Sequence, residues 1–196
     1  MKYIISGTDR NDSNTLKVSH IIKGYFEKLN EKVEIIDLRD LKNDLLSGPY
    51  YGAKELPPTL KVTLEKVLQS EGLIVVAPEY NGSMPGILKY FIDHLKFPES
   101  FEYRPVAFVG LGGLFGGLRP VEHLQQVFGY RNAFIYPQRV FLMNVFKVMK
   151  DGQLQDALMN QLLEDQARGF TKFCAALKES GLAANQVLAT KAAKGS

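Results

Sequence analysis

Five side chains that form hydrogen bonds gather in eight positions near the N-terminus: Thr8, Arg10, Ser13, Asn14 and Thr15. They stand where the helical pattern of the following residues begins. The first N–H groups of a helix have no intrahelical partner and lie at the positive end of its dipole. Hydroxyl groups and an arginine beside them would form a cradle for a phosphate dianion. Capping by Asp12 or Ser13 is the alternative, but it explains one of these residues and not five.

A second unusual segment reads Pro78-Glu79-Tyr80-Asn81-Gly82-Ser83-Met84-Pro85-Gly86. It separates the continuous apolar run 73–77 from an amphipathic run with helical spacing. Such a turn joins the carboxyl end of a buried strand to a helix, where open α/β sheets bind ligands. An ordinary connection, with Ser83 as the helix N-cap and Pro85 in the first turn, remains an equal alternative on local chemistry alone.

A glycine-rich run follows a later strand-like segment, with five glycines in the eight residues 110–117. It does not have the G-x-G-x-x-G spacing of dinucleotide-binding loops, since Phe115 stands at the sixth position. Glycines allow backbone N–H groups to approach a flat ring closely. A flexible turn explains them at least as well.

Other catalytic patterns are missing from the sequence. It has no G-x-S-x-G nucleophile motif, and His20, His94 and His123 are scattered without metal-ligand spacing. The one cysteine, Cys174, falls on an apolar helical face, which predicts a buried structural thiol. The sequence therefore predicts no metal site.

Strand-like and helical segments alternate along the chain. Strands are predicted over residues 2–6, 33–36, 73–77 and 106–109, with further extended pieces at 133–135 and 140–143. Helices are predicted over residues 16–29, 60–68, 87–96, 121–128 and 154–177, and Gly181 ends the last one. Residues 38–58 form a long irregular connection, in which Tyr50 and Tyr51 either cover the site or belong to a solvent loop.

This alternation predicts an α/β fold: a doubly wound, five-stranded parallel sheet with helices on both faces. Five strands fit the flavodoxin-like order 2-1-3-4-5, whose flavin site is the crevice at the topological switch point. The turns after strands one, three and four wall that crevice, and the three unusual segments follow those three strands. We expect one domain over residues 1–181 and a poorly ordered C-terminal tail over 182–196.

Composition narrows the class of protein. The chain has 196 residues, of which 45% are hydrophobic and 23% charged, as in globular domains with a sizeable core. No apolar run approaches the ~20 residues of a membrane helix, and the N-terminus lacks a signal-peptide core. A net charge of +3 without a basic stripe argues against nucleic acid. We expect a cytoplasmic protein that binds neither membranes nor nucleic acid.

Taken together, the three segments resemble the NADPH-dependent FMN reductase family, which includes quinone, azo-dye and chromate reductases. The resemblance covers residues 2–177 and rests on three motifs: residues 8–13, Pro78-Glu79-Tyr80-Asn81-x-Ser83-x-Pro85-Gly86-x-Leu88-Lys89, and Gly113-x-x-Gly116-Gly117-x-Arg119. The chain departs from the family pattern at Thr15 and Tyr90, where the family often has asparagine.

The resemblance implies that the protein binds FMN and forms a homodimer or homotetramer. The implied phosphate-binding residues are Thr8, Arg10, Ser13, Asn14 and Thr15. The isoalloxazine would be lined, partly through backbone N–H groups, by Pro78, Glu79, Tyr80 and Asn81. The pyrimidine edge of the ring would meet the loop that contains Gly110, Gly112 and Gly113.

The activity implied by the resemblance is ping-pong hydride transfer from NADPH or NADH. The hydride passes through FMN N5 to a small electrophilic acceptor such as a quinone or azo compound, and no catalytic side chain is required. The alternatives are a flavodoxin-type electron carrier and a non-catalytic FMN-binding protein. The charge of +3 and the absence of tryptophan argue against the carrier.

Overall fold

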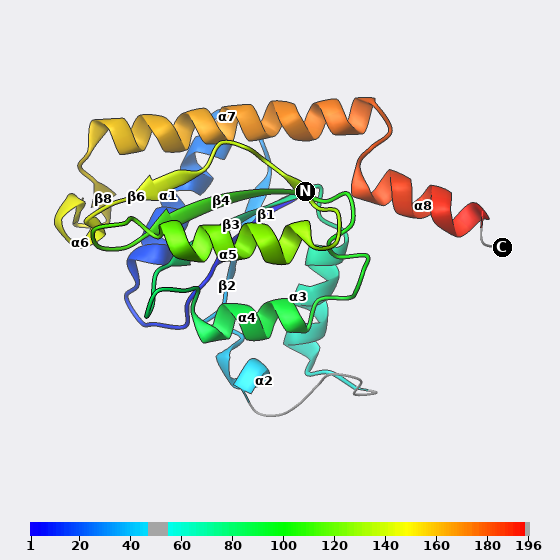
Figure 1. Ribbon diagram of the computed structural model, residues 1–196, viewed down its shortest axis with the longest axis horizontal. Helices are drawn as coiled ribbons and strands as arrows, with labels where there is room; N and C mark the ends of the chain where they lie inside the picture. Colours follow the sequence, from blue (N-terminus) through cyan, green and yellow to red (C-terminus); the bar gives the residue numbers. More distant parts are fainter. Residues whose placement is uncertain (47–54, 195–196) are drawn as a thin grey trace.

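A parallel sheet forms the centre of the computed structural model, which describes residues 1–46 and 55–194. Its strands lie in the order β2-β1-β3-β4-β5, and Figure 1 shows β1 to β4 in the middle of the molecule. The four longer strands are β1 (Lys2–Ser6), β2 (Val33–Asp37), β3 (Gly72–Pro78) and β4 (Pro105–Leu111). Each neighbouring pair among them is parallel. The predicted flavodoxin-like fold and strand order are therefore confirmed.

The fifth position of the sheet is divided between two short strands, so the sheet has six strands and not five. Both β5 (Phe134–Ile135) and β6 (Val140–Leu142) pair in parallel with β4. The carbonyl of Phe108 lies on β4 between these two pairings. Gln166 Nε2, from a flanking helix, donates to that carbonyl (3.0 Å) and to the Gln138 carbonyl (2.8 Å). A side-chain amide thus replaces ladder bonds where the edge strand is interrupted.

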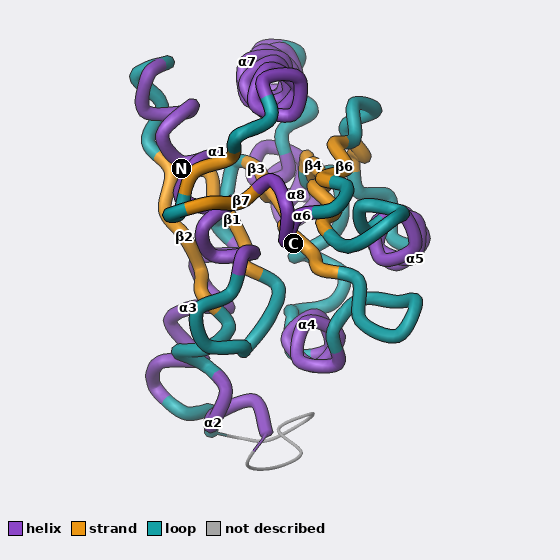
Figure 2. The backbone as a smooth tube through the Cα atoms, turned by 90° about the vertical axis from the view of Figure 1, so that its left-hand side faces the viewer, coloured by secondary structure: helices purple, strands orange, loops and turns teal. Residues whose placement is uncertain are grey.

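Helices cover both faces of the sheet (Figure 2). Contacts of buried side chains place α1 and α7 on one face, and α3, α4 and α5 on the other. Their bounds are α1 (Asn14–Lys28), α3 (Pro58–Leu68), α4 (Gly86–Asp93), α5 (Leu118–Gly129) and α7 (Ala157–Glu179). None of the described helices is long and apolar enough to cross a membrane.

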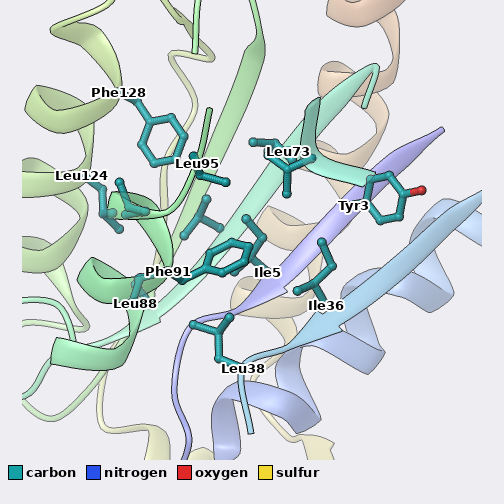
Figure 3. Packing of buried hydrophobic residues seen from close by; sticks show 14 of the residues in the cluster. Tyr3, Ile5, Ile36, Leu38, Leu73, Leu88, Phe91, Leu95, Leu124 and Phe128 are labelled. Carbon is teal, nitrogen blue, oxygen red and sulfur yellow. The ribbon is translucent and has the colours of Figure 1, made fainter. Parts of the chain in front are cut away.

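Successive residues of the central strands point to opposite faces, and both faces are covered. Ile4 packs with the residues of α1 and α7, whereas Ile5 packs with those of α4. Figure 3 shows Ile5, Leu73 and Phe91 in the second of these layers, between the sheet and the helices. Because each strand is buried on both sides, its sequence is a continuous apolar run and does not alternate.

The connection over residues 38–58 is not irregular throughout. It contains α2 (Lys42–Leu46), because Leu41 and Leu45 are one helical turn apart and both are buried in the core. Tyr50 and Tyr51 lie outside the described residues.

The last part of the chain differs from the predictions in three respects. Leu154 belongs to a short hairpin, β7 (Met149–Lys150) and β8 (Gln153–Leu154), which follows α6 (Val145–Val148). Helix α7 begins only at Ala157, after the cap Asp156. Residues 184–194, which the sequence assigns to a poorly ordered tail, form α8 (Ala184–Lys194), with Ala184 buried.

The strand register brings four loops to one edge of the sheet. Ser6 lies opposite Val76, Val76 opposite Val109, and Leu111 opposite both Pro78 and Leu142. The carboxyl ends of β1, β3, β4 and β6 are therefore level with one another. The segments that follow these strands must meet at this edge.

Candidate functional site

The largest group of predicted site residues surrounds one cavity at the carboxyl edge of the sheet. This main cavity has a volume of about 370 Å³. It is lined by Arg10, Asn11, Asp12, Ser13, Asn14, Thr15, Lys17, Pro78, Glu79, Tyr80, Leu111, Gly112, Gly113, Val145 and Phe146. Three predicted residues, Thr8, Asn81 and Gly110, do not line it. The three unusual segments of the sequence therefore do share one hollow.

One end of the main cavity is the beginning of α1. Ser13 is the N-cap in extended conformation, and its Oγ accepts a hydrogen bond from the Leu16 amide (3.2 Å). Capping by Ser13 is thus confirmed, and the amides of Asn14 and Thr15 lie in the same first turn. Lys17 Nζ lies 2.8 Å from Asp12 Oδ1, and this hydrogen bond lowers the pKa of the exposed Asp12 carboxyl. Donors, a helix dipole and cations gather at this end.

Tyr80 connects the first loop with the turn after β3. The guanidinium carbon of Arg10 lies 3.8 Å from the centre of the Tyr80 ring, within the range of a cation–π contact. The Tyr80 hydroxyl shares a hydrogen bond with Thr8 Oγ1 (2.9 Å). Thr8 is fully buried. It does not line the main cavity and holds Tyr80 in place, and its predicted contact with a phosphate stays a prediction.

The turn after β3 is a tight hairpin between Tyr80 and Ser83. Their backbone N–H groups donate to each other's carbonyls, at 3.0 and 3.1 Å. Asn81 and Gly82 both have positive φ, 51° and 75°, which is the type I′ pattern that Asn-Gly favours. The Asn-Gly pair in the sequence would have predicted this turn. Ser83 is not the cap of α4, since Pro85 takes that position and Ser83 Oγ bonds His123 Nδ1 (2.9 Å).

Asn81 lies beside the main cavity, on a smaller side cavity of about 260 Å³. The side cavity is lined by Glu79, Asn81, Gly82, Gly113, Leu114 and Phe115. Glu79 and Gly113 line both cavities. The two hollows therefore adjoin across these two residues.

The glycine-rich loop owes its shape to close backbone contacts. A Cβ atom at Gly110 would lie 2.5 Å from the Gly117 carbonyl oxygen, so Gly110 serves packing under the loop and is not part of the cavity wall. The Gly112 amide donates to the Leu142 carbonyl (3.2 Å). In turn, the Asn144 amide donates to the Gly113 carbonyl (2.8 Å). The loop is thereby tied to the segment after β6.

Two backbone amides that were expected to face the ring already donate hydrogen bonds within the protein. The Glu79 amide donates to the Leu111 carbonyl (3.0 Å), and the Tyr80 amide donates within its own turn. Pro78 has no N–H group. Of residues 78–81, only Asn81 therefore has a backbone N–H group left for the expected contact with the ring.

The sequence profile of one family, NADPH-dependent FMN reductase, matches residues 3–147. The chain belongs to this family. An FMN-dependent NADPH-azoreductase of Staphylococcus saprophyticus is 30% identical over 179 residues, which cover 86% of this chain and 94% of that protein.

Solved structures of similar fold include a flavoenzyme and an azoreductase. An NAD(P)H:(acceptor) oxidoreductase from Paracoccus denitrificans has a TM-score of 0.68 at 18% identity, covering 89% of this chain and 97% of that one. An azoreductase from Bacillus anthracis has a TM-score of 0.58 at 15% identity, covering 87% and 98%. At these identities the likeness establishes the fold alone.

Some cavity residues of this FMN reductase family member were missed by the sequence analysis. Val145 and Phe146 follow β6 and line the main cavity, and Phe146 is 78% exposed. The rule that parallel strands end at one edge would have indicated them, had the split fifth strand been aligned with β4. Leu111 was missed because β4 extends two residues beyond its predicted end.

The remaining candidate groups lie outside both cavities. Cys174 is buried and lines neither the main cavity nor the side cavity, and desolvation raises the pKa of its thiol to about 12. Among residues 1–46 and 55–194, no three His, Cys, Asp or Glu side chains gather as metal ligands. In the described residues, the site is therefore a cavity lined by hydrogen-bond donors and apolar groups, and no cluster of metal ligands is found there.

Proposed function

We propose that the protein is an FMN-dependent NAD(P)H oxidoreductase that reduces small electrophilic acceptors such as quinones or azo compounds. The observation that carries this proposal is the main cavity. It joins a helix N-terminus and cations at one end to a flat wall of backbone and apolar side chains at the other. Membership of the FMN reductase family, and the azoreductase among its relatives, supports the same reaction class.

The residues at the α1 end suit the phosphate of FMN. Arg10 supplies a permanent positive charge, and Ser13, Asn14 and Thr15 supply hydroxyl, amide and backbone donors at the positive end of the helix dipole. The cavity volume of about 370 Å³ lies in the usual range for a cofactor site. Thr8 acts indirectly, by holding Tyr80.

The walls between β3, β4 and β6 suit a flat ring. Pro78 and Tyr80 come from the end of β3 and its turn, Gly112 and Gly113 from the loop after β4, and Phe146 from the segment after β6. When bound, FMN supplies the hydride chemistry, accepting from NAD(P)H and giving to the acceptor. The protein contributes orientation and exclusion of water, and no side chain serves as an obligatory acid or base.

The side cavity is the proposed site for both the nicotinamide and the acceptor. It adjoins the main cavity at Glu79 and Gly113 and is open along the exposed side chains of Leu114 and Phe115. Two substrates that use one opening must take turns. This supports a ping-pong order, in which the oxidised nucleotide leaves before the acceptor binds.

The decisive experiment adds NADPH, and separately NADH, to the FMN-loaded protein without oxygen. We expect the visible flavin absorbance to be bleached and then restored by a quinone or an azo dye. If neither nucleotide bleaches the bound flavin, the oxidoreductase is rejected. Electron exchange with redox proteins would then indicate a flavodoxin-type carrier, and tight FMN retention without any exchange would indicate a non-catalytic binder.

We also propose that the protein forms a homodimer or homotetramer. Three large side chains near the C-terminal ends of α4 and α5 are exposed, namely Tyr90, Phe97 and Tyr130 (52%, 58% and 78%). Exposed aromatic groups of this kind are enriched in interfaces between chains. Light scattering should give at least twice the monomer mass, and Tyr130→Glu should lower it. A monomeric wild-type protein would contradict the proposal.

A further inference from the structure

Helix α5 contacts both loops that enclose the side cavity, and it does so chiefly through Arg119. Arg119 Nη1 lies 2.6 Å from Glu79 Oε1, in the turn after β3. Its guanidinium carbon lies 4.5 Å from the centre of the Phe115 ring, in the glycine-rich loop. Its Cδ also lies 3.7 Å from where a Cβ of Gly82 would be. One side chain therefore packs against both walls of the side cavity.

Glu79, the charged partner of Arg119, is much less exposed than Arg119 itself. The Glu79 side chain is 14% exposed, whereas that of Arg119 is 46% exposed. A carboxylate with little access to water depends on its cationic partner more strongly than a surface carboxylate does. Without Arg119, the Glu79 carboxylate would turn toward water and change the wall that separates the two cavities.

A second contact holds the far end of the same turn. His123, one helical turn after Arg119, shares the 2.9 Å hydrogen bond with Ser83. Glu79 and Ser83 flank the turn residues Asn81 and Gly82, both with positive φ. Helix α5 therefore contacts the hairpin at both ends, through Arg119 and His123.

We propose that Arg119 is a positioning residue that sets the shape of the side cavity, and thereby the affinity for the nucleotide and the acceptor. The inference rests on the proposed function, because it takes the side cavity as the substrate site. Arg119 lines neither cavity. Its effect is transmitted through Glu79 and Phe115, while His123 supports the same turn.

The first experiment compares Arg119→Gln, Glu79→Gln and the double variant in steady-state turnover of NADPH and a quinone. For Arg119→Gln we expect KM to rise about tenfold, as for loss of a charged hydrogen bond, with a much smaller change in kcat. In the double variant, KM should be no higher than in the more impaired single variant, because both substitutions remove the same contact. Arg119→Lys should recover part of the loss, since it retains the charge but not the planar stack on Phe115. Additive effects, or an unchanged KM, would overturn the proposal.

The second experiment needs no turnover. In the protein without FMN, amide hydrogen exchange of residues 79–83 and 113–117 should quicken by about tenfold in Arg119→Gln and less in His123→Ala. Arg168→Gln, which removes an exposed ion pair on α7, is the matched control and should leave these segments unchanged. If amide exchange of these segments is unchanged in Arg119→Gln, the proposal that Arg119 positions the two loops is overturned. If the wild type fails to turn over NADPH, the proposed function fails, and exchange alone still decides whether Arg119 holds the two loops.

Discussion

At the scale of single residues, the site depends on side chains that connect loops distant in the sequence. Tyr80 is the clearest case, because its ring lies under Arg10 and its hydroxyl meets Thr8. The sequence predicted all three as ligands of a cofactor. The structure divides the roles: Arg10 and Tyr80 line the main cavity, and Thr8 is buried behind them.

Arg10 should contribute strongly to FMN binding, because it is the only arginine among the described residues that line the main cavity. Arg10→Ala should raise the FMN dissociation constant by about ten- to a hundredfold, as expected for one or two charge-assisted hydrogen bonds to phosphate. Quenching of FMN fluorescence measures this directly. Arg168→Ala is the control and should bind FMN like the wild type. An unchanged affinity in Arg10→Ala would place the phosphate elsewhere.

Cys174 should be inert in the folded protein. It is 7% exposed, and burial raises its thiol pKa to about 12, so the reactive thiolate is scarce at neutral or mildly alkaline pH. A chromogenic disulfide reagent at about pH 8, where a free thiol already reacts, should label Cys174 only after denaturant is added. Rapid labelling of the native protein would contradict the buried position.

At the scale of elements, the sequence predicted what periodicity and strand burial dictate. The four long strands and the helices around them follow from continuous apolar runs and helical spacing, and their order was predicted correctly. The two extended pieces at 133–135 and 140–143 were predicted, but their shared pairing with β4 was not, because Gln166 bridges Phe108 and Gln138 from far along the chain. Helix α2 was missed because only two buried leucines indicate it, Leu41 just before the helix and Leu45 within it.

Within the site, too, the sequence predicted the loops but not which of their residues line the cavity. Residue type identified the three loops, since hydroxyl groups, prolines and glycines are informative locally. It did not separate cavity residues from supporting ones such as Thr8 and Gly110, because that depends on which backbone lies behind them. Val145 and Phe146 carry no motif, and only the alignment of β6 with β4 brings them to the cavity.

Gly110 tests the account of the glycine-rich loop. Gly110→Ala would place a Cβ 2.5 Å from the Gly117 carbonyl oxygen and 2.8 Å from that of Gly116, so the loop must shift. We expect a loss of about 1–3 kcal/mol in the free energy of unfolding, measured by urea denaturation. Gly24→Ala on α1, where a Cβ meets nothing within 4 Å, should instead stabilise the protein by roughly 0.5–1 kcal/mol. Equal effects of the two substitutions would refute the tight packing beneath this loop.

At the scale of the whole molecule, the parallel register gathers the ends of four strands at one edge. The sheet is buried on both faces by helices, so this edge is where the described loops enclose a cavity of about 370 Å³. The N-terminal end of α1 forms the positively charged end of this cavity, and backbone and apolar side chains form its other walls. The phosphate and the ring of one ligand are therefore expected to lie at opposite ends of the main cavity.

The most direct test compares the binding of FMN and riboflavin, which share the ring and differ in the phosphate. Titration of the cofactor-free protein, followed by flavin fluorescence, should give FMN an affinity about a hundredfold higher, because the helix N-terminus and Arg10 act on the phosphate alone. Equal affinities for the two flavins, or failure to bind either one, would contradict the account.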